Sequence, residues 1–529
     1  MLSENKPRDS AAFSSEARRY INRHFHIVFR RMVYVLLFAT IQIAALIWVF
    51  LRMHALIPYF ILLCVLISLL ASMHIINKNS NPAIKIAWLI PLFTMPIFGG
   101  LLYLMFGSHR ANRRLHNVTD DLREKYKTAN TAAALCEETS LIPPDAARIS
   151  SYIGHASGCL PFVGTQTQYY PTGDAFFPAL CEALRNAKRY IFLEYFIIEE
   201  GTFWDTVLEI LTERAAAGVE VRVMYDDFGS MLTLPITYDR FLRERGIKAH
   251  VFNPFNTVLS PRPNNRDHRK ITVIDGVTAF VGGINIADEY INVREKHGHW
   301  KDSALRLTGD AAWGAAIQFL SVWDADTRTG TDIGLYLPER SDAVTPDNGI
   351  VQPYTDIPGD CEQVGENVYF QMITRAQKYI YLTTPYLIID HTLMTALMTA
   401  AKSGVDVRIV TPHIPDKKSV FFLTRSHYKP LLDAGVRIYE YTPGFIHAKS
   451  MVTDDRFAVV GSINLDYRSL YLHLENAVWM HQTSAVTDLR DDILHTLEVS
   501  EEVHEDILGR MTVAKRLWLT ILRTFAPLL

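Results

Sequence analysis

The chain has 529 residues, of which 49% are hydrophobic and 21% charged, and its formal net charge at pH 7 is −3. This length suffices for two sizeable domains and an additional segment, whereas the net charge lacks the basic excess typical of nucleic-acid-binding proteins. Five scattered cysteines without a C-x-x-C pair argue against a disulfide framework or a cysteine zinc site, and they fit a reducing compartment.

The N-terminal part has the composition of a membrane segment. Residues 33–51 and 55–73 carry no charge, and 19 helical residues span about 28 Å, close to the thickness of a bilayer core. A third uncharged stretch, residues 86–106, is interrupted by two prolines and a glycine pair, as in a kinked span, a re-entrant hairpin or an interfacial helix. No signal-peptide cleavage pattern follows the first stretch. We therefore predict a membrane segment over residues 33–106, preceded by a cytoplasmic tail over residues 1–32.

Flanking basic residues predict the orientation of this segment. Five arginines between positions 18 and 31 precede the first span, only Arg52 lies between the first two spans, and Lys78 and Lys85 follow the second. The positive-inside tendency places the N-terminus and the Lys78 loop in the cytoplasm. Three arginines within residues 110–114 are cytoplasmic as well if the third stretch does not cross. We predict two crossings and a cytoplasmic catalytic part.

Two stretches with the same local pattern follow the membrane segment. Residues 107–150 are charged and alanine-rich, which predicts a helical connector. Residues 151–330 and 351–500 each predict the order helix, strand, helix, strand, helix, strand and β-hairpin, and a polar linker over residues 331–350 joins them. This alternation predicts two α/β repeats with largely parallel sheets covered by helices. The basic amphipathic tail, residues 501–529, either lies on an anionic membrane surface or packs as a last helix on the second repeat.

One short motif, H-x-K-x4-D, occurs near the end of both stretches. Its residues are His268, Lys270 and Asp275 in the first copy and His447, Lys449 and Asp454 in the second. Each copy continues to a pair of small residues and an asparagine, Asn285 or Asn464, and the copies are 179 residues apart at both the histidine and the asparagine. One copy alone could be incidental polar residues on an edge strand. Two copies in register indicate a duplicated catalytic half-site.

The residues after each histidine predict a β-hairpin. Residues 271–274 and 450–453 are β-rich and end at turn sequences, and second strands follow at 279–281 and 458–460. Histidine and lysine two positions apart on a strand point to the same side. An imidazole beside an ammonium group suits a phosphate, because the imidazole supplies a nucleophile or a proton and the ammonium neutralises oxygen charge.

These motifs resemble the HKD motifs of the phospholipase D superfamily. Residues 265–270, 282–290 and 383–386, together with the apolar N-terminal segment, are similar to bacterial cardiolipin synthases. The resemblance implies two phospholipase D-like α/β repeats related by pseudo-two-fold symmetry, preceded by a transmembrane helical segment, in a multi-pass enzyme of the bacterial plasma membrane. It further implies one active site at the interface of the repeats.

The activity implied is transfer of a phosphatidyl group between two phosphatidylglycerol molecules, which gives cardiolipin and glycerol. A phosphatidyltransferase of the phosphatidylserine synthase type and a hydrolytic phospholipase D are the alternatives. A nuclease fits the motifs but not the apolar spans, and an inactive membrane scaffold does not fit two intact motifs. The expected partners are phosphatidylglycerol and the bilayer, not nucleic acid. The preferred head group and the oligomeric state are not specified by the sequence.

The resemblance also implies a phosphohistidine intermediate, with His268 as nucleophile and His447 as general acid and base, although the pseudo-symmetry leaves the reverse assignment open. Lys270 and Lys449, helped by Asn285 and Asn464, would bind the non-bridging phosphate oxygens, so that neither a metal nor another cofactor is expected.

Four carboxylates complete the predicted site. Asp275 and Asp454 lie five residues beyond their lysines, roughly 17 Å along the strand, and are expected to hold the turn of the motif. Asp302 and Glu475 follow the two motifs and are candidates for orienting the histidines. The alternative for this second pair is an ordinary surface position.

Overall fold

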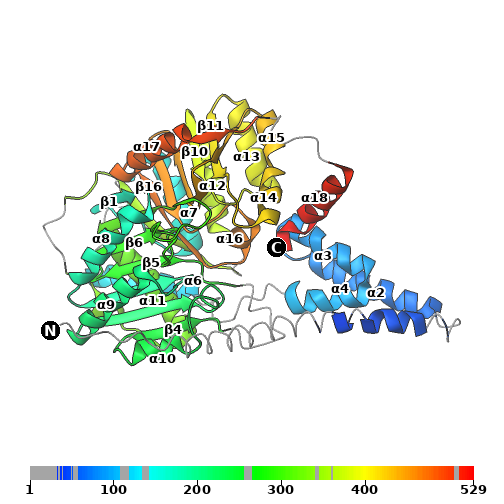
Figure 1. The fold of residues 1–529 in the computed structure, drawn as a ribbon, viewed down its shortest axis with the longest axis horizontal. Coiled ribbons are helices and arrows are strands. Elements are labelled where there is room, and N and C mark those ends of the chain that lie inside the picture. Colours follow the sequence, from blue (N-terminus) through cyan, green and yellow to red (C-terminus); the bar gives the residue numbers. More distant parts are fainter. Residues whose placement is uncertain are drawn as a thin grey trace.

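The computed structural model describes residues 57–107, 118–133, 142–254, 265–339, 345–358, 362–504 and 512–528, together with parts of residues 33–51. Figure 1 shows a large α/β body and, to one side of it, a group of helices from the N-terminal and C-terminal ends of the chain. The predicted tail over residues 1–32 lies outside the described residues, as do residues 34–35, 39 and 49–50 of the first predicted span.

The N-terminal helices follow the predicted apolar stretches. Among the described residues, α2 (Ile57–Ile76) is the one helix long and apolar enough to cross a membrane, with a mean hydropathy of 2.5. The third stretch is broken, as predicted, into α3 (Pro82–Thr94), α4 (Pro96–Leu102) and the π-helical turn η2 (Tyr103–Gly107). A shorter apolar helix over Leu36–Trp48 belongs to the first predicted span.

A close backbone contact fixes the bend between α3 and α4. The two helices meet at Met95, whose backbone is not helical. A Cβ atom on Gly99 would lie 2.3 Å from the carbonyl oxygen of Pro91, so only glycine permits α4 to pack this closely on α3. The third stretch is therefore two short helices and not one long one.

The first α/β repeat, residues 151–330, contains a seven-stranded sheet in the order β1-β8-β6-β5-β2-β3-β4. Its strands are β1 (Thr165–Tyr170), β2 (Tyr190–Tyr195), β3 (Glu220–Asp226), β4 (Lys248–Phe252), β5 (Lys270–Ile274), β6 (Thr278–Gly282) and β8 (Ala304–Gly309). Its helices are α8 (Gly173–Arg185), α9 (Thr202–Ala216), α10 (Tyr238–Arg243) and α11 (Asp310–Thr327). The connector contains α6 (Val118–Ala133) and α7 (Pro144–Ser157).

The second repeat is built around an eight-stranded sheet whose strands lie between Ile350 and Glu502, in the order β17-β12-β11-β10-β14-β15-β16-β9. Its strands are β9 (Ile350–Asp356), β10 (Tyr379–Thr383), β11 (Asp406–Pro412), β12 (Arg437–Tyr441), β14 (Ser450–Thr453), β15 (Phe457–Gly461), β16 (Glu475–His481) and β17 (Ser500–Glu502). Its helices are α12 (Val364–Arg375), α13 (His391–Lys402), α14 (Lys418–Arg425), α15 (Tyr428–Asp433), α16 (Tyr467–Tyr471) and α17 (Ser484–Glu498).

The predicted alternation of helices and strands and the two predicted hairpins are confirmed, but the prediction of largely parallel sheets is wrong. Within the two large sheets, as far as the structure describes them, only β2-β3-β4 and β10-β11-β12 pair in parallel. The motif hairpins β5-β6 and β14-β15 join these strands antiparallel, and every further strand on that side is antiparallel as well. A tight hairpin can only produce an antiparallel pair, so each motif reverses the strand direction in the middle of its sheet.

The two repeats share one hydrophobic core. Every side chain of α11 from Ala311 to Asp324 is buried, and α11 contacts β5, β6 and β8 of the first repeat as well as β9 of the second. Two short strands, β7 (His299–Lys301) and β13 (Gly444–Ile446), form a parallel pair across the repeats. The repeats are therefore held in a fixed relation by packing and by backbone hydrogen bonds.

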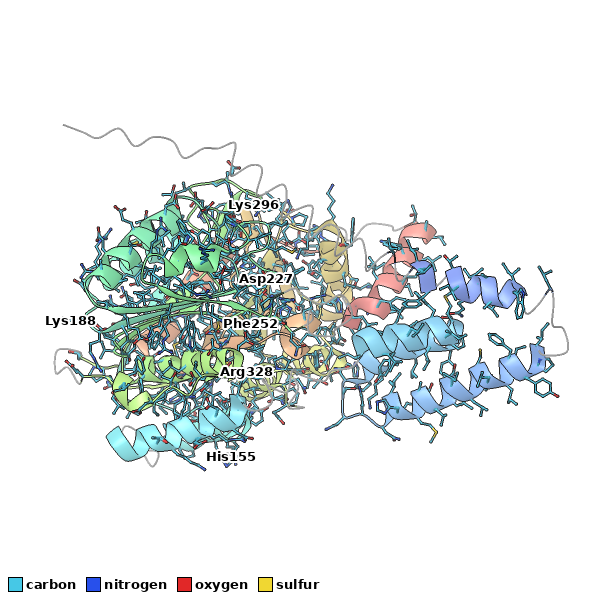
Figure 2. All side chains as sticks on the ribbon, turned by 90° about the horizontal axis from the view of Figure 1, so that it is seen from below. His155, Lys188, Asp227, Phe252, Lys296 and Arg328 are labelled. Carbon is cyan, nitrogen blue, oxygen red and sulfur yellow. The ribbon has the colours of Figure 1, made fainter. Side chains whose placement is uncertain are left out.

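The C-terminal tail forms α18 (Val513–Phe525) and the 3-10 turn η7 (Ala526–Leu528). Helix α18 contacts α14 of the second repeat and α3 of the N-terminal helices, while η7 contacts α16 and α3. In Figures 1 and 2 the tail lies where these two parts meet. It packs on the second repeat, as one of the two alternatives predicted, and Leu517 and Trp518 on its other face remain exposed.

Candidate active site

Backbone contacts between the repeats place the two motif histidines at the interface. The amide of His268 donates to the carbonyl oxygen of Leu474 at 2.9 Å, and the amide of His447 donates to that of Lys301 at 2.7 Å. Each histidine therefore lies at the start of its own hairpin and beside a strand of the other repeat. Both imidazoles are buried.

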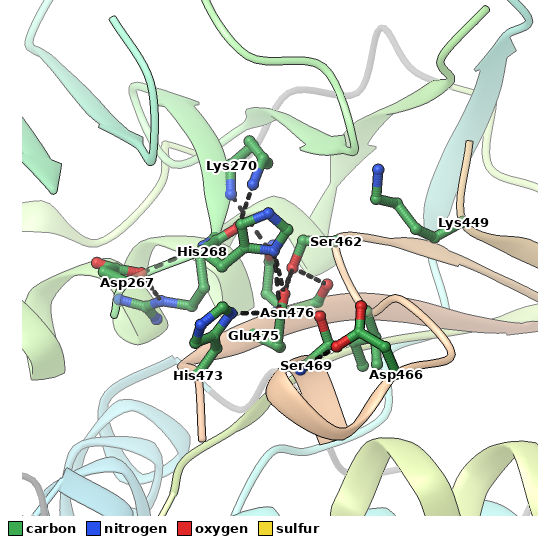
Figure 3. A network of polar contacts seen from close by, with 12 residues as sticks. Asp267, His268, Lys270, Lys449, Ser462, Asp466, Ser469, His473, Glu475 and Asn476 are labelled. Carbon is green, nitrogen blue, oxygen red and sulfur yellow. Dashed lines mark hydrogen bonds and ion pairs between the residues drawn. The ribbon is translucent and has the colours of Figure 1, made fainter. Parts of the chain in front are cut away.

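Each histidine is oriented by a carboxylate of the other repeat. Nδ1 of His268 lies 2.9 and 3.0 Å from the carboxylate oxygens of Glu475 (Figure 3). Nδ1 of His447 lies 2.6 Å from Oδ2 of Asp302. Because each carboxylate accepts a hydrogen bond from Nδ1–H, the ring proton is held at Nδ1 and Nε2 of each ring is left for chemistry. Asp302 and Glu475 are fully buried, so neither is an ordinary surface carboxylate. Nothing in the local sequence indicates that the pairing crosses between the repeats.

The two lysines make matching contacts. Nζ of Lys270 donates to the carbonyl oxygen of His268, and Nζ of Lys449 donates to that of His447. Nζ of Lys449 also lies 2.7 Å from Nδ1 of His447 and 3.8 Å from Asp302. The motif thus brings its lysine beside its histidine, as the spacing predicts.

Burial and mutual repulsion set the charge state of the site. Burial, followed by the charges of Lys270 and Lys449, holds the pKa of both His268 and His447 well below the usual range. Burial lowers the pKa of Lys270 to about 7 and that of Lys449 to about 8, and it raises the pKa of Asp302 to about 6. Without a ligand, both imidazoles are therefore neutral at pH 7. Since lysines of both motifs act on both histidines, the two half-sites form one site.

Equivalent positions in the two repeats support the two carboxylates differently. Gly283 packs on Asp302 so closely that a Cβ atom on it would lie 2.2 Å from Oδ1 of Asp302. The amide of Ser303 donates to the same carboxylate at 2.8 Å. In the second repeat, Ser462 occupies the position of Gly283, and its hydroxyl donates to Glu475. The site is therefore only approximately symmetric.

The predicted phosphate-binding asparagines are buried beside the motifs. Oδ1 of Asn285 accepts from the amide of Ile197 at 3.0 Å, and its Nδ2 donates to Tyr290 at 2.7 Å, so this side chain braces the surrounding loops. Oδ1 of Asn464 has no hydrogen-bond partner among the described residues. Phosphate binding by either asparagine stays a prediction.

The aspartates that end the two motifs bind backbone. Asp275 accepts from three consecutive amides, beginning at Lys188, at 2.7 to 2.9 Å. Asp454 accepts in the same way from the three amides beginning at Gln377, also at 2.7 to 2.9 Å. Each carboxylate thus ties the turn of its hairpin to the start of the neighbouring strand.

Aromatic side chains and a third histidine surround the site, and the sequence analysis gave them no role. The ring of His473 lies 5.6 Å from that of His268, while Trp300 and Tyr290 lie 5.5 and 5.6 Å from His447. His473 directly precedes the Leu474-Glu475 pair that contacts the first repeat, and this adjacency is the one signal that could have identified it. Burial lowers the pKa of His473 to about 4.

One group among the described residues has the composition of a metal site. Ligand atoms of His268, His473 and Glu475 all lie within 4.8 Å of one another. Two imidazoles and a carboxylate are a usual ligand set for Zn²⁺. A metal bound there would occupy His268 and separate it from Glu475, so the geometry fits an inhibitory ion better than a resident cofactor.

Comparison with known proteins agrees with this geometry. Residues 180–298 and 369–497 match the family described as cardiolipin synthase, PLD-like domain, and residues 66–108 match a phospholipase D-nuclease N-terminal region. An uncharacterized protein of Streptococcus mutans is 40% identical over 86% of this chain and 99% of its own length. A cardiolipin synthase of Alkalihalophilus pseudofirmus is 34% identical over 85% of this chain and 90% of its own length.

A solved structure shows the same fold. The phosphatidylserine synthase of Haemophilus influenzae superposes with a TM-score of 0.55 at 17% identity, over 73% of this chain and 98% of the solved one. The paired half-sites, the family match over both repeats and the extent of similarity to a named cardiolipin synthase lead to one conclusion. The chain belongs to the cardiolipin synthase family of the phospholipase D superfamily and is a phosphatidyltransferase.

Proposed function

We propose that the enzyme transfers a phosphatidyl group from one phosphatidylglycerol to the glycerol hydroxyl of another, giving cardiolipin and glycerol. The observation that carries this proposal is the pair of neutral, buried imidazoles, each oriented by a carboxylate of the other repeat and each beside a lysine. Such a pair can attack phosphorus with one ring and move a proton with the other.

In the first half-reaction, Nε2 of His268 attacks phosphorus and the bond from phosphorus to the glycerol head group breaks. His447 gives its proton to the departing glycerol oxygen, so that free glycerol leaves. In the second half-reaction, His447 takes the proton from the hydroxyl of a second phosphatidylglycerol, whose oxygen attacks phosphorus. The phosphorus–nitrogen bond breaks, which restores His268. Lys270 and Lys449 neutralise the non-bridging oxygens throughout.

The charge of the buried site explains how His447 becomes protonated. Two ammonium groups and the carboxylates of Asp302 and Glu475 balance one another while both imidazoles are neutral. A bound phosphodiester adds one negative charge, so uptake of one proton by an imidazole restores the balance. We propose that substrate binding itself charges His447, and that the carboxylate of Asp302 holds the resulting imidazolium.

The apolar helices favour a lipid acceptor over water. Most of α2 is exposed although its mean hydropathy is 2.5, and exposing such a surface to water is unfavourable. We propose that α2 crosses the bacterial plasma membrane and holds the site close to the lipid head groups, where an oriented second lipid competes effectively with water.

The product distribution tests this function. Purified enzyme in vesicles of phosphatidylglycerol should form cardiolipin and glycerol in equal amounts, and added glycerol should reduce net cardiolipin formation, because one phosphodiester is exchanged for another. Phosphatidic acid as the main product would identify a hydrolytic phospholipase D. Formation of phosphatidylserine from an added serine acceptor, without cardiolipin, would identify the phosphatidylserine synthase type.

We also propose two crossings and a cytoplasmic site. The third stretch is divided at Met95, and α3, its longer part, has 13 residues, about 20 Å of helix, against about 30 Å for a bilayer core, whereas the uncharged first stretch continues over residues 33–51. Four variants test this topology, and each is free of cysteine except for one, at position 5, 54, 80 or 120. An impermeant maleimide should label only position 54 from outside intact cells, and external labelling of position 120 would place the catalytic repeats outside.

A further inference from the structure

A cavity of about 350 Å³ lies between the second repeat and the C-terminal tail. One wall comes from α14, through Val420 and Leu423, and the opposite wall comes from the tail, through Leu522 and Ala526. Tyr386, in the loop after β10, and Asp466, just before α16, close one end. Most of this lining is apolar.

The tail side of the cavity is continuous with the N-terminal helices. Leu423 and Ala526 of the lining belong to the same hydrophobic cluster as Ile84, Trp88 and Leu92 of α3. Figure 2 shows α18 against the N-terminal helices, on the side of the second repeat that faces away from the first. A chain leaving a bilayer around α2 and α3 would therefore reach the cavity without crossing open water.

The other end of the cavity adjoins the active site. Asp466 lies two residues after Asn464, and Figure 3 shows it on the loop beside Lys449 and Glu475. The hydroxyl of Tyr386 donates to Asp416 at 2.6 Å, and the charge of Asp416 acts on His447. The lining thus shares a hydrophobic cluster with α3 on one side, and on the other side it includes Asp466, whose charge acts on Lys449.

Two basic side chains, Lys417 and Arg468, also line the cavity. Lys417 is largely exposed, with 66% of its side chain accessible, at the rim. An apolar cavity with cationic groups near its mouth complements an anionic lipid, whose phosphate is charged and whose chains are not. The volume corresponds to about twelve groups of the size of a water molecule at about 30 Å³ each. That is enough for the glycerol backbone and the first part of an acyl chain, but not for a whole lipid.

We propose that this cavity holds the glycerol backbone and the proximal acyl chain of an anionic phospholipid whose phosphate lies in the active site, with the C-terminal helix as one of its walls. This inference rests on the proposed lipid substrate and adds where the lipid binds and which segment selects it. It assigns the basic amphipathic tail a part in substrate binding.

Filling the cavity tests the proposal. Leu522→Trp places an indole in the cavity, whereas Thr520→Trp adds the same bulk to an exposed position of the same helix and serves as the control. Turnover of long-chain phosphatidylglycerol is compared with that of glycerophosphoglycerol, which has the same phosphodiester but no acyl chains. Leu522→Trp should lower kcat/KM for the long-chain lipid about tenfold or more, and change it for glycerophosphoglycerol by no more than about twofold. Thr520→Trp should change neither.

The proposal would be overturned if Leu522→Trp, with unchanged thermal unfolding, lowered kcat/KM equally for both substrates. It would also be overturned if kcat/KM fell for neither substrate. If Leu522→Trp lowers the unfolding temperature, Ser419→Trp is used in its place. Ser419 lines the cavity from the exposed start of α14, so its indole would also fill the cavity.

Crosslinking separates this proposal from the proposed function. The His268→Ala variant is irradiated with phosphatidylglycerol that carries a diazirine near the ester end of one acyl chain, and the modified peptides are identified by mass spectrometry. Adducts should lie on α14 and α18, and Leu522→Trp should reduce them. If these adducts form but the unmodified enzyme produces phosphatidic acid, the proposed lipid-binding cavity is supported and the proposed cardiolipin synthase activity is refuted. Cardiolipin formation with adducts only elsewhere would support the synthase and refute the cavity.

Discussion

The crossed pairing of carboxylates and histidines makes a sharp prediction about Asp302→Asn. The change keeps the shape of the side chain but removes the charge that lies 2.6 Å from Nδ1 of His447. With charge centres about 4 Å apart and an effective dielectric constant of about 20, the lost interaction with the imidazolium is about 4 kcal/mol. Each 1.4 kcal/mol corresponds to about a factor of ten, so turnover of phosphatidylglycerol should fall about a thousandfold.

The assay uses two substrates that differ in what the leaving group requires. Phosphatidylglycerol releases an alkoxide that must be protonated, whereas a phosphatidyl p-nitrophenol releases a stable phenolate without a proton. If His447 is the acid, Asp302→Asn and His447→Ala should both keep a rapid burst of p-nitrophenol. Glu475→Gln and His268→Ala should both lose it, because they remove or misplace the nucleophile.

The way the four variants group together decides whether each histidine depends on the carboxylate of the other repeat or on that of its own. Crossed pairing requires Asp302→Asn to behave like His447→Ala and Glu475→Gln to behave like His268→Ala. Grouping by repeat, with Asp302→Asn resembling His268→Ala, would refute the pairing. If Asp302→Asn and His447→Ala lose the burst while Glu475→Gln and His268→Ala keep it, the crossed pairing stands. In that case His447 is the nucleophile and His268 the acid. Asp416→Asn, which removes a charge near His447 without a hydrogen bond to it, is the control and should cost less than about tenfold.

Four further predictions follow from the site. His268→Ala and His447→Ala should each abolish turnover, and the double variant should be little worse, because residues that act as a unit are not additive; substantial cardiolipin formation by either single variant would contradict one shared site. Burial lowers the pKa of Lys270 to about 7, and only the protonated amine neutralises phosphate, so kcat/KM should fall as the pH rises through about 7. Lys270→Arg should move this loss of kcat/KM to higher pH. An unchanged pH profile in this variant would assign the loss to another titrating group. Chelators should leave activity intact, whereas added Zn²⁺ should inhibit; His473→Gln should weaken that inhibition, and an unchanged inhibition constant would place the ion elsewhere. Asp275→Ala should lower the free energy of unfolding by about 1–3 kcal/mol, since three amides lose their acceptor. Asp275→Asn should lower it less, because asparagine tolerates the φ of 54° at this position; equal losses in thermal unfolding would show that the backbone conformation does not matter.

The predicted parts of the fold are those that local sequence determines. A β-rich run followed by an Asp-Gly turn and a second apolar run is enough to identify the hairpin after His268, and the structure has β5 and β6 there. The sheets could not be predicted in the same way, because β8 and β9 add to their sheets through contacts between residues far apart in the sequence. Strand direction on that side follows from those contacts and not from the local pattern.

The same distinction applies to the site. The H-x-K spacing identifies His268 and Lys270, since both belong to one strand start. The partner of His268 is 207 positions away in the sequence, at Glu475, and only the approach of Leu474 to the first repeat brings it close. No pattern within either repeat specifies that a carboxylate serves the histidine of the other. The sequence identifies Ser462 as one of the small residues after the second motif but not as a partner of Glu475, and it predicts no role for His473, because both roles come from contacts in the fold.

The exchange of carboxylates between the repeats also affects the protein while it is being made. A ribosome completes His268 and Lys270 more than 200 residues before Glu475. Until Glu475 is made, the nascent first repeat holds a histidine without its orienting carboxylate, and until His447 is made it lacks the second histidine of the site. Under the proposed mechanism, the enzyme can become active only after β16, which supplies Glu475, has been added. We therefore expect chains that end before β16 to leave the surrounding phospholipid intact during translation.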